Sequence, residues 1–316
     1  MILGTPHGAA PSRLPRAQRE VTLVVNPHAT HVRGHHAVDR VVAALRSAGA
    51  RVEVVTTESL DELALRLAEA RGGRVVLLGG DGTVHAVANC PDPLPDLGLI
   101  PAGAANNVAH CLGIPTALDA AADLAVNGTA RRIDLIEALA GPRRTRVVEG
   151  VSVGYLALAR ARYHAENSSD VRAALAAGLA ALAGFHPLDV RVRCNGCPGT
   201  DWNAPRETLH VAQLFVANMS TYGTGLRVAP HADPADGLLD LVAVGGRGRA
   251  GIPAMLVRLR RGTHVGRPEV AMRRVSSVRI DGRGRSPVIA DSDDLGVGPV
   301  TLRVLPGALG LVAPLR

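Results

Sequence analysis

One stretch, residues 74–89 (RVVLLGGDGTVHAVAN), constrains the fold of this 316-residue chain more than any other. The apolar run at 75–78 predicts a buried strand, which ends at a pair of glycines because glycine tolerates the backbone angles of a sharp turn. Residues 84–89 predict the start of a helix, with Thr83 or Asp81 near its N-cap. The stretch therefore predicts a strand, a glycine-rich turn and a helix in immediate succession.

The turn between this strand and this helix predicts a phosphate site. Backbone N–H groups converge at a helix N-terminus, and the helix dipole favours an anion there. A carboxylate at Asp81 could also hold Mg²⁺ or orient the attacking hydroxyl during phosphoryl transfer. The turn is not a Walker loop, since no Gly-Lys-Ser/Thr follows it and the chain contains no lysine. A tight turn capped by an aspartate is the alternative, because short motifs of this kind also occur by chance.

The first 130 residues alternate between strand and helix patterns, which predicts a parallel sheet. Strands are expected at 21–25, 52–55, 75–78 and 97–100, and helices at 34–48, 60–71, 84–89, 108–112 and 117–126. Ligands of such sheets bind at the carboxyl ends of the strands. Asn26, Thr56, the glycine turn and the turn at 101–107 all follow strands directly, so we expect them at one edge.

After residue 130 the pattern changes to short alternating runs separated by turn residues, which is typical of an antiparallel sandwich. These runs lie at 132–138, 145–151, 188–193, 207–217, 238–244, 270–280, 288–290 and 300–304, with helices at 156–165, 171–183 and 250–261. The sequence thus predicts an α/β N-terminal nucleotide-binding domain with a parallel sheet, followed by a mostly antiparallel β-sandwich domain.

Charge and composition indicate an anionic partner. The formal net charge of +7 rests on arginine and points to nucleotide, acidic lipid headgroups or nucleic acid, although a general preference for arginine over lysine would produce the same excess. Residues 1–20 lack the apolar segment of a signal peptide, and the apolar stretch at 173–184 is too short to span a bilayer. We expect a cytoplasmic protein that touches a membrane only from outside.

The cysteines do not predict a disulfide framework. Cys194 and Cys197 form a C-x-x-C, but the Asn195-Gly196 pair between them is also a signal for a two-residue hairpin. A closed zinc site needs four ligands, and no second Cys or His pair lies nearby. A hairpin tip is therefore favoured over zinc.

Several motifs in this order resemble the catalytic domain of the diacylglycerol kinase family, which includes bacterial lipid kinases and sphingosine kinases. They are Asn26-Pro27, the glycine turn, the turn at 101–107, the segment 230–240 (PHADPADGLLD) and the closing segment 306–309 (PGAL). The glycine motif alone is shared with NAD kinases and phosphofructokinases. The last two segments favour a lipid kinase.

The resemblance implies that ATP lies across the glycine turn, in the cleft between the domains, and that the sandwich domain holds the lipid. The composition of residues 1–20 predicts a flexible tail, and the change of periodicity predicts a domain boundary near residue 130. With the resemblance, this gives an ATP-binding domain at 21–130, a lipid-binding domain at 131–305 and a segment 306–316 that returns to the first domain. Nucleotide contacts are implied at Asn26, Thr56, Gly79, Gly80, Asp81, Gly82, Thr83, Gly103 and Asn106.

The resemblance also implies a metal site and an acidic pair. Mg²⁺ would be held by Asp236 with backbone oxygens of Asp233 and Leu238, and a hairpin turn is the alternative. Asp291 and Asp293 align with the family's D-G-E, whose carboxylates activate the lipid hydroxyl, so the implied catalytic residues are these two and Asp81. A solvated acidic turn is the alternative for this pair.

This sequence departs from the family pattern at several of these positions. The family's G-T-x-N-D is here Gly103-Ala104-Ala105-Asn106-Asn107, and its Asn-Glu after the glycine turn is His85-Ala86. The glutamate of D-G-E is the shorter Asp293. Glu149 and Leu156 stand where Asn and Asp are frequent. These changes leave turnover and lipid choice open. Each lost hydrogen bond to a charged group slows the reaction or weakens binding without abolishing activity.

Three hypotheses follow. The first is a lipid kinase that uses ATP and Mg²⁺, with diacylglycerol as the leading acceptor. The second is a nucleotide-binding lipid sensor that has lost some or all catalysis, and the third is an NAD kinase. The arginine excess fits visits to anionic membrane surfaces, and no nucleic-acid partner is expected. The sequence leaves the oligomeric state open.

Overall fold

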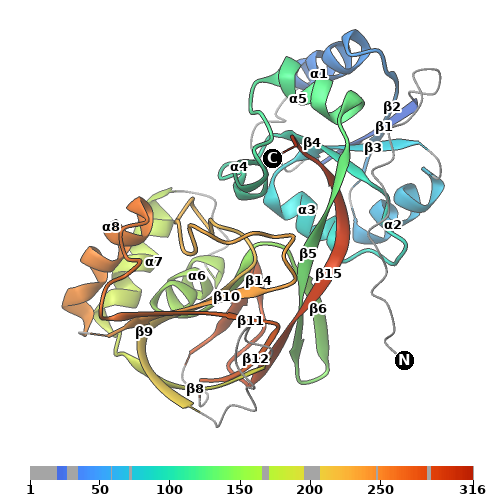
Figure 1. Ribbon diagram of the computed structural model, residues 1–316. Coiled ribbons are helices and arrows are strands. Elements are labelled where there is room, and N and C mark those ends of the chain that lie inside the picture. Colours follow the sequence, from blue (N-terminus) through green and yellow to red (C-terminus); the bar gives the residue numbers. More distant parts are fainter. Residues whose placement is uncertain are drawn as a thin grey trace, which may run out of the picture.

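The computed structural model describes residues 20–26, 35–57, 59–70, 73–165, 171–195, 207–246, 248–282 and 286–315. It shows an N-terminal α/β domain and a C-terminal β-rich domain, whose strands join in one continuous sheet (Figure 1). The predicted tail lies outside the described residues except for Glu20, which is the first residue of strand β1.

The N-terminal domain is built on parallel strands in the order β4-β3-β1-β2. The strands are β1 (Glu20–Val25), β2 (Arg51–Thr56), β3 (Arg74–Gly79) and β4 (Leu97–Pro101). The helices are α1 (His35–Ser47), α2 (Leu60–Glu69), α3 (Asp81–Ala88), α4 (Asn107–Leu112) and α5 (Leu118–Asn127). The predicted parallel α/β domain is confirmed.

Strand β3 lies at the centre of this domain, and all of its residues are buried. Val75 and Leu77 pack in one apolar cluster with side chains of α2 and α3, whereas Val76 and Leu78 pack in another with α1 and α5. Successive side chains of a strand point to opposite faces, so helices cover the sheet on both sides. The turn after β3 is therefore fixed by a rigid, two-sided core.

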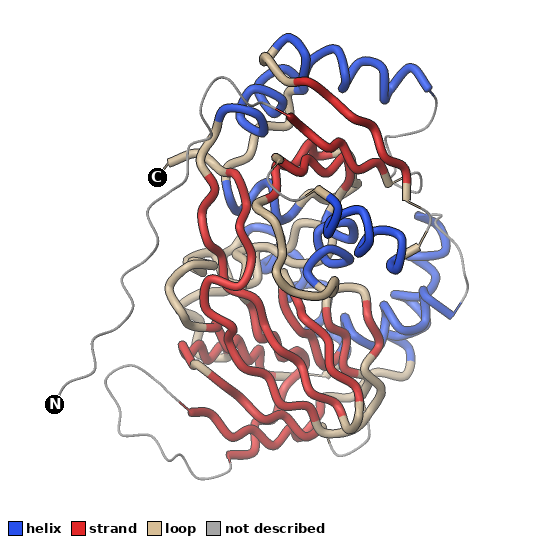
Figure 2. The backbone as a smooth tube through the Cα atoms, turned by 90° about the vertical axis from the view of Figure 1, so that its right-hand side faces the viewer, coloured by secondary structure: helices blue, strands red, loops and turns tan. Residues whose placement is uncertain are grey.

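The C-terminal domain is a mostly antiparallel β-structure, as predicted (Figure 2). Its strands are β5 (Ala130–Ala140), β6 (Arg143–Val147), β7 (Gly150–Gly154), β8 (Leu188–Asn195), β9 (Glu207–Ala217), β10 (Leu239–Gly245), β11 (Val270–Val275), β12 (Ser277–Asp281), β13 (Val288–Ala290), β14 (Asp293–Asp294) and β15 (Val300–Val312). Its helices are α6 (Tyr155–Ala165), α7 (Val171–Ala183) and α8 (Ile252–Arg261), with a short 3₁₀ helix, η1 (Arg249–Gly251). Aromatic and aliphatic side chains from these helices, such as Tyr155 and Leu259, pack against Phe215 of β9.

Two runs that the sequence predicted as single strands are each divided. Residues 145–151 fall in β6 and β7, because the chain turns at 148–149, where its N–H groups bind the side chain of Asp291. Residues 270–280 fall in β11 and β12, which separate at Ser276. There β11 pairs with β10, whereas β12 pairs with β8 and β15. Periodicity within one run does not reveal such a change of partner.

Strand β15 connects the two domains. Its first residues pair antiparallel with β12, much of its length pairs with β5, and Leu311 pairs parallel with Leu97 of β4. Residues after 305 thus lie beside the parallel sheet of the N-terminal domain. The paired strands β5 and β15 form the bridge between the domains in Figure 1.

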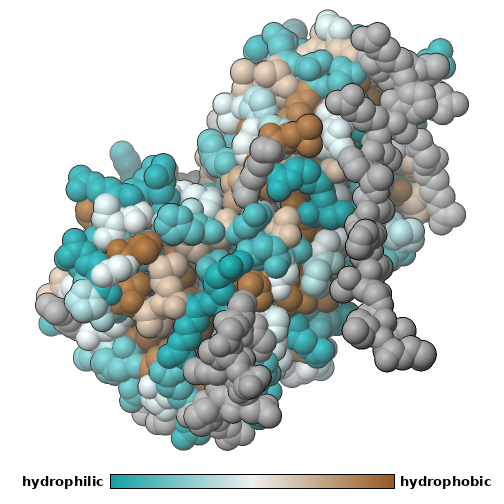
Figure 3. Space-filling view, in the orientation of Figure 1, coloured by the Kyte–Doolittle hydropathy of each residue, from teal (hydrophilic) through white to brown (hydrophobic). Residues whose placement is uncertain are grey.

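Within the described segments, no helix is long and apolar enough to cross a membrane. On the face shown in Figure 3, hydrophilic and hydrophobic residues are interspersed. The predicted hairpin tip at Cys194–Cys197 falls largely outside the described residues, and Asn195 is the last residue of β8, where it pairs with Ser277.

Candidate active site

The residues predicted at the carboxyl edge of the parallel sheet lie together there. Asn26 follows β1, and its side-chain amide donates a hydrogen bond to the hydroxyl of Thr83, at 3.0 Å. Thr56 ends β2 in register with Val25, the residue before Asn26. The structure therefore brings the ends of β1, β2 and β3 to one edge.

The glycine turn after β3 touches the glycine turn after β4. A Cβ added at Gly80 would lie 2.7 Å from the Cα of Gly103, closer than real Cβ atoms approach backbone. Asn106, in the left-handed region at φ 50°, closes the second turn by accepting from the N–H of Gly103 and donating to its carbonyl oxygen, both at 2.9 Å. The two turns thus form one rigid cradle, and glycine is required where they meet.

Helix α3 begins earlier than the sequence indicated. Its N-cap is Gly80, without a side-chain cap, so Asp81 and Thr83 lie inside the first turn instead of capping it. The first N–H groups of a helix lack intrahelical acceptors. No described residue lies within 4 Å of a Cβ built at Gly82, so the described part of the chain leaves space beside this first turn. These features suit an anion placed on the cradle.

Asp81 has a structural partner that the sequence did not predict. Its two carboxylate oxygens accept the N–H groups of Asn107 and Val108, at 3.0 and 2.9 Å, and so cap the N-terminus of α4. Burial raises the pKa of Asp81, while these two hydrogen bonds oppose the rise. Asp81 therefore holds α4 against α3 in addition to any contact with a ligand.

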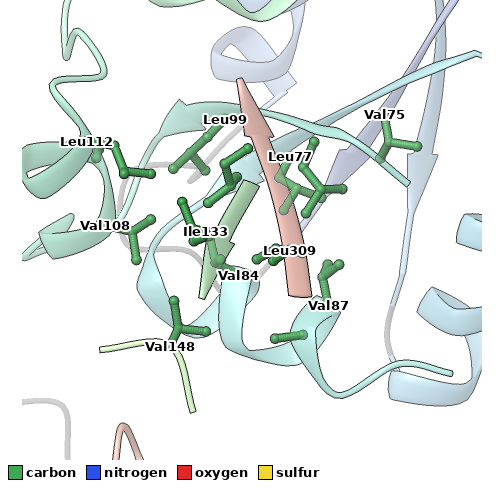
Figure 4. Close-up of a cluster of buried hydrophobic side chains, with 14 of the residues drawn as sticks. Val75, Leu77, Val84, Val87, Leu99, Val108, Leu112, Ile133, Val148 and Leu309 are labelled. Carbon is green, nitrogen blue, oxygen red and sulfur yellow. The ribbon is translucent and has the colours of Figure 1, made fainter. Parts of the chain in front are cut away.

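A shared apolar cluster fixes α3 and α4 against the second domain. Val84 and Val87 of α3 and Val108 of α4 pack with Ile133 of β5 and Leu309 of β15 (Figure 4). All five side chains are fully buried. Burial of this much aliphatic surface stabilises the junction by several kcal/mol, on the order of 1.5–3 kcal/mol for each large side chain.

His85 joins α3 to the acidic pair of the sandwich domain. Its Nδ1 lies 2.8 Å from Oδ2 of Asp291, and its Nε2 lies 3.3 Å from Oδ2 of Asp293. Burial lowers the pKa of His85, but hydrogen bonds and charge interactions with both aspartates outweigh it and raise the pKa to about 10. His85 is therefore an imidazolium at neutral pH that bridges the two carboxylates.

The two aspartates of the pair have different surroundings. Asp291, at φ 47°, has a side chain only 6% exposed and accepts N–H groups of residues 148, 149 and 150 at 2.7–3.1 Å. Asp293 is 37% exposed, and its hydrogen bond to His85 lowers its pKa. Asp291 is thus an anchored acceptor, whereas Asp293 is the accessible carboxylate of the pair.

A buried carboxyl group lies between the pair and α4. Glu149 accepts from the side-chain amide of Asn107 at 2.8 Å and from the N–H of Gly223 at 3.2 Å. Burial, followed by repulsion from Asp291 and Asp81, raises the pKa of Glu149 well above its usual value. The amide at Asn107, a departure from the family pattern, is therefore matched by a carboxyl group at Glu149, another departure.

The predicted metal position is arranged as a turn. One carboxylate oxygen of Asp236 accepts the N–H of Leu238 at 2.9 Å, and the other pairs with Arg274. Asp233 accepts the N–H of Ala235 at 3.3 Å. No group of three Asp, Glu, His or Cys side chains that could hold a metal gathers within the described ranges. The predicted position thus holds a turn and an ion pair, and Mg²⁺ binding by Asp236 with backbone oxygens of Asp233 and Leu238 stays a prediction.

Sequence reasoning missed how His85, Asn107, Glu149 and Asp134 are used. Asp134 of β5 accepts from Gly237 and Gly307 and so ties both motif segments to one carboxylate. One signal was available: His85 is four residues after Asp81, so both lie on the same face of α3. The partners of the other three are distant in sequence and gave no local signal.

Known proteins resemble this chain across both of its domains. Residues 20–138 match the model of the diacylglycerol kinase catalytic domain, and residues 149–313 match the YegS C-terminal NAD kinase beta sandwich-like domain. The chain is 30% identical to a diacylglycerol kinase of Mycobacterium tuberculosis over 93% of its length and 95% of that protein. It is 30% identical to the probable lipid kinase YegS of Escherichia coli over 62% of this chain and 66% of that one.

A solved structure supports the fold. A diacylglycerol kinase from Bacillus anthracis superposes with a TM-score of 0.67 at 19% identity, over 94% of this chain and 97% of that one. The family models together cover both domains, and the sequence identity extends across both. The chain therefore belongs to the diacylglycerol kinase family of lipid kinases.

Proposed function

We propose that this protein transfers the γ-phosphate of ATP to a lipid hydroxyl, with diacylglycerol as the leading acceptor. One observation carries the proposal: α3 presents the phosphate cradle at its N-terminus and, one turn later, His85 in contact with both carboxylates of the acidic pair. Donor and acceptor sites would thus share one helix. Positioning of the two reactants is a large part of catalysis in phosphoryl transfer.

In the proposed reaction the lipid hydroxyl oxygen attacks the γ-phosphorus, the bond to the β–γ bridging oxygen breaks, and ADP leaves. Asp293 accepts the hydroxyl proton, because its carboxylate is accessible and its lowered pKa keeps it ionised. Asp291 and His85 position Asp293 without contacting the substrate. Mg²⁺ would enter with ATP, bound to the phosphates of the substrate.

The acceptor lipid places this reaction at a membrane surface. The net charge of +7 would favour an anionic bilayer, where each basic group near the surface adds about 1 kcal/mol of binding free energy. Flotation with anionic and with neutral vesicles tests this part, and equal partitioning would contradict it.

The direct test is incubation with MgATP and diacylglycerol in mixed micelles, followed by detection of phosphatidate. Asp293→Asn should lower kcat by about 10²-fold or more, since it removes the proton acceptor. Asp294→Asn is the matched control, because the side chain of Asp294 is exposed and, among the described residues, accepts a hydrogen bond only from the N–H of Gly296. It should keep activity within about twofold. Equal rates for wild type and Asp293→Asn would contradict the proposed role.

A second candidate function, a nucleotide-binding sensor with reduced catalysis, is favoured by the same contact. His85 is hydrogen-bonded to one oxygen of Asp291 and one of Asp293, the carboxylates to which the family resemblance assigns a catalytic role. Tight ATP binding without a phosphorylated product from any lipid would support the sensor. An assay with NAD as the acceptor would detect NAD kinase activity in the same experiment.

A further inference from the structure

A cavity of about 890 Å³ opens between α4 and the sandwich domain. One wall comes from the turn and helix at Ala104, Asn107 and His110. The opposite wall comes from the chain around Thr224 and Arg227 and from the last turn of α8, which ends in two arginines. We call this space the basic cavity. In Figure 1, α4 and α8 lie on the facing sides of the two domains.

The wall of the basic cavity is strongly positive. Arg227, Arg260 and Arg261 line it together with His110, whereas no carboxylate belongs to its described wall. A concave surface with one sign of charge concentrates ions of the opposite sign. Arginine suits phosphate in particular, because its planar fork donates two parallel hydrogen bonds. The cavity therefore favours a phosphate-bearing ligand over a neutral one.

The arginines differ in how they are held. Arg260 donates to the carbonyl oxygen of Thr224 at 2.5 Å, which fixes its side chain across the cavity wall. The guanidinium groups of Arg227 and Arg261 have no hydrogen bond or ion pair with any described residue, and both side chains are exposed. One arginine thus shapes the wall, and two are free to bind.

Two further polar atoms at this wall await a partner. The hydroxyl oxygen of Thr221 and the amide oxygen of Asn107 are buried without any hydrogen-bond partner in the described part of the chain. A buried polar group without a partner costs about 1–3 kcal/mol. A hydroxyl can donate to a phosphate oxygen, and an amide oxygen can accept from a ligand hydroxyl. Both residues belong to the cavity wall.

The basic cavity is distinct from the nucleotide cradle. None of Asn26, Thr56 or the residues from Gly79 to Thr83 lines it, whereas Ala104 and Ala105 of the turn before α4 do. Behind Asn107, the buried side chain of Glu149 accepts a hydrogen bond from the Asn107 amide and does not line the cavity. A phosphate bound in the cavity would therefore lie next to the nucleotide without sharing its contacts.

We infer that the basic cavity binds the phosphate of an acceptor lipid's headgroup, so that the protein accepts, in addition to diacylglycerol, lipids that carry both a phosphate and a free hydroxyl. That the ligand is an acceptor rests on the proposed function, whereas binding of its phosphate does not depend on catalysis. A phosphate group in the cavity could also belong to ATP or to free phosphate, and the experiment separates these sources.

The test uses the double variant Arg227→Gln/Arg261→Gln, which removes the two free guanidinium groups. The matched control is Arg191→Gln/Arg193→Gln, which removes two exposed arginines of β8 outside the cavity. Calorimetric titration with glycerol 3-phosphate, inorganic phosphate and ATP, at fixed ionic strength, measures binding without turnover. We expect glycerol 3-phosphate to bind at least about tenfold more weakly to the cavity variant, with ATP binding unchanged.

Kinetics with two acceptors then test the lipid class. For phosphatidylglycerol, which has a phosphate and a free hydroxyl, the cavity variant should raise KM about tenfold or more, whereas KM for diacylglycerol should change less than twofold. Equal losses with both acceptors, equal weakening of ATP, or a loss matched by the β8 control would overturn the inference. Inorganic phosphate that binds as tightly as glycerol 3-phosphate would also overturn the headgroup assignment. Arginine-dependent glycerol 3-phosphate binding without product from any lipid would contradict the kinase and leave the phosphate site standing.

Discussion

The two sides of the cleft hold their polar groups in different ways. On the side that we propose binds nucleotide, which we call the nucleotide side, the cradle is set by close backbone approach between Gly80 and Gly103 and by a local side-chain turn at Asn106. On the acid side, Asp291 is set by charge-assisted hydrogen bonds to His85 and to backbone N–H groups more than 140 positions away in sequence. Added side-chain volume in the cradle should therefore lower stability and ATP affinity, whereas on the acid side stability should depend on charge and pH.

The largest effect is expected from Asp291→Asn. This change keeps the size of a buried side chain but removes its charge and turns an NH₂ group toward N–H donors and His85. We expect the free energy of unfolding to fall by about 3–5 kcal/mol, as when one partner of a buried ion pair is lost. Urea denaturation measures it. Asp293→Asn, at a site 37% exposed, should cost less than about 1 kcal/mol, and similar losses at both positions would contradict the proposed difference between them.

A smaller effect is expected on the nucleotide side from Gly80→Ala. The new Cβ would meet the backbone of Gly103 at 2.7 Å, so the two turns must separate. Overpacking of this kind costs about 1–3 kcal/mol, and ATP affinity should fall with it. Gly82→Ala is the control, since no residue that the structure describes lies within 4 Å of its Cβ and alanine favours a helix. The steric argument fails if Gly82→Ala destabilises as much as Gly80→Ala.

The acid side should also lose stability as pH rises. The pKa of His85 is raised in the folded state to about 10, from 6.5, so its contribution is complete below about pH 6.5 and is lost as pH rises toward 10. Between pH 7 and 9, wild type should lose roughly 2 kcal/mol of unfolding free energy beyond any loss in His85→Gln. Parallel pH profiles for the two proteins would show that His85 does not stabilise the acidic pair.

The sequence predicted the nucleotide side better than the acid side, for a physical reason. The strand, glycine turn and helix are adjacent in the chain, so local patterns identify them and the parallel order places their ends together. The actual N-cap at Gly80 was missed because no side chain marks it. The family resemblance supplied the motifs, but not the contacts that they make here.

On the acid side the sequence located Asp291 and Asp293 without revealing how they differ. Their exposures and pKa shifts depend on His85 and on the turn at residues 148–150, which only the assembled domains bring near. That turn also divides a run predicted as one strand. The contact between Asn107 and Glu149 could not be predicted from either residue alone. Each residue differs from the family pattern, and the two differences are explained by the hydrogen bond between them.

The smallest effect is expected from Asp236→Asn, which tests whether charge matters in the same way outside the cleft. Asp236 pairs with Arg274 and binds the N–H of Leu238, and the arginine side chain is half exposed. Partly exposed pairs contribute about 0–1 kcal/mol, so unfolding should become easier by no more than that.

The same variant separates the turn from the predicted metal site. If Asp236 only closes a turn, activity measured against total Mg²⁺ should give the same half-saturating concentration as in wild type, because the metal then arrives on ATP. Arg274→Gln should match Asp236→Asn in stability, since each removes one partner of the same pair. The contrary result would be a half-saturating Mg²⁺ concentration that is severalfold higher in Asp236→Asn but unchanged in Arg274→Gln. It would show that the Asp236 carboxylate binds a metal and that Arg274 leaves this carboxylate when the metal binds.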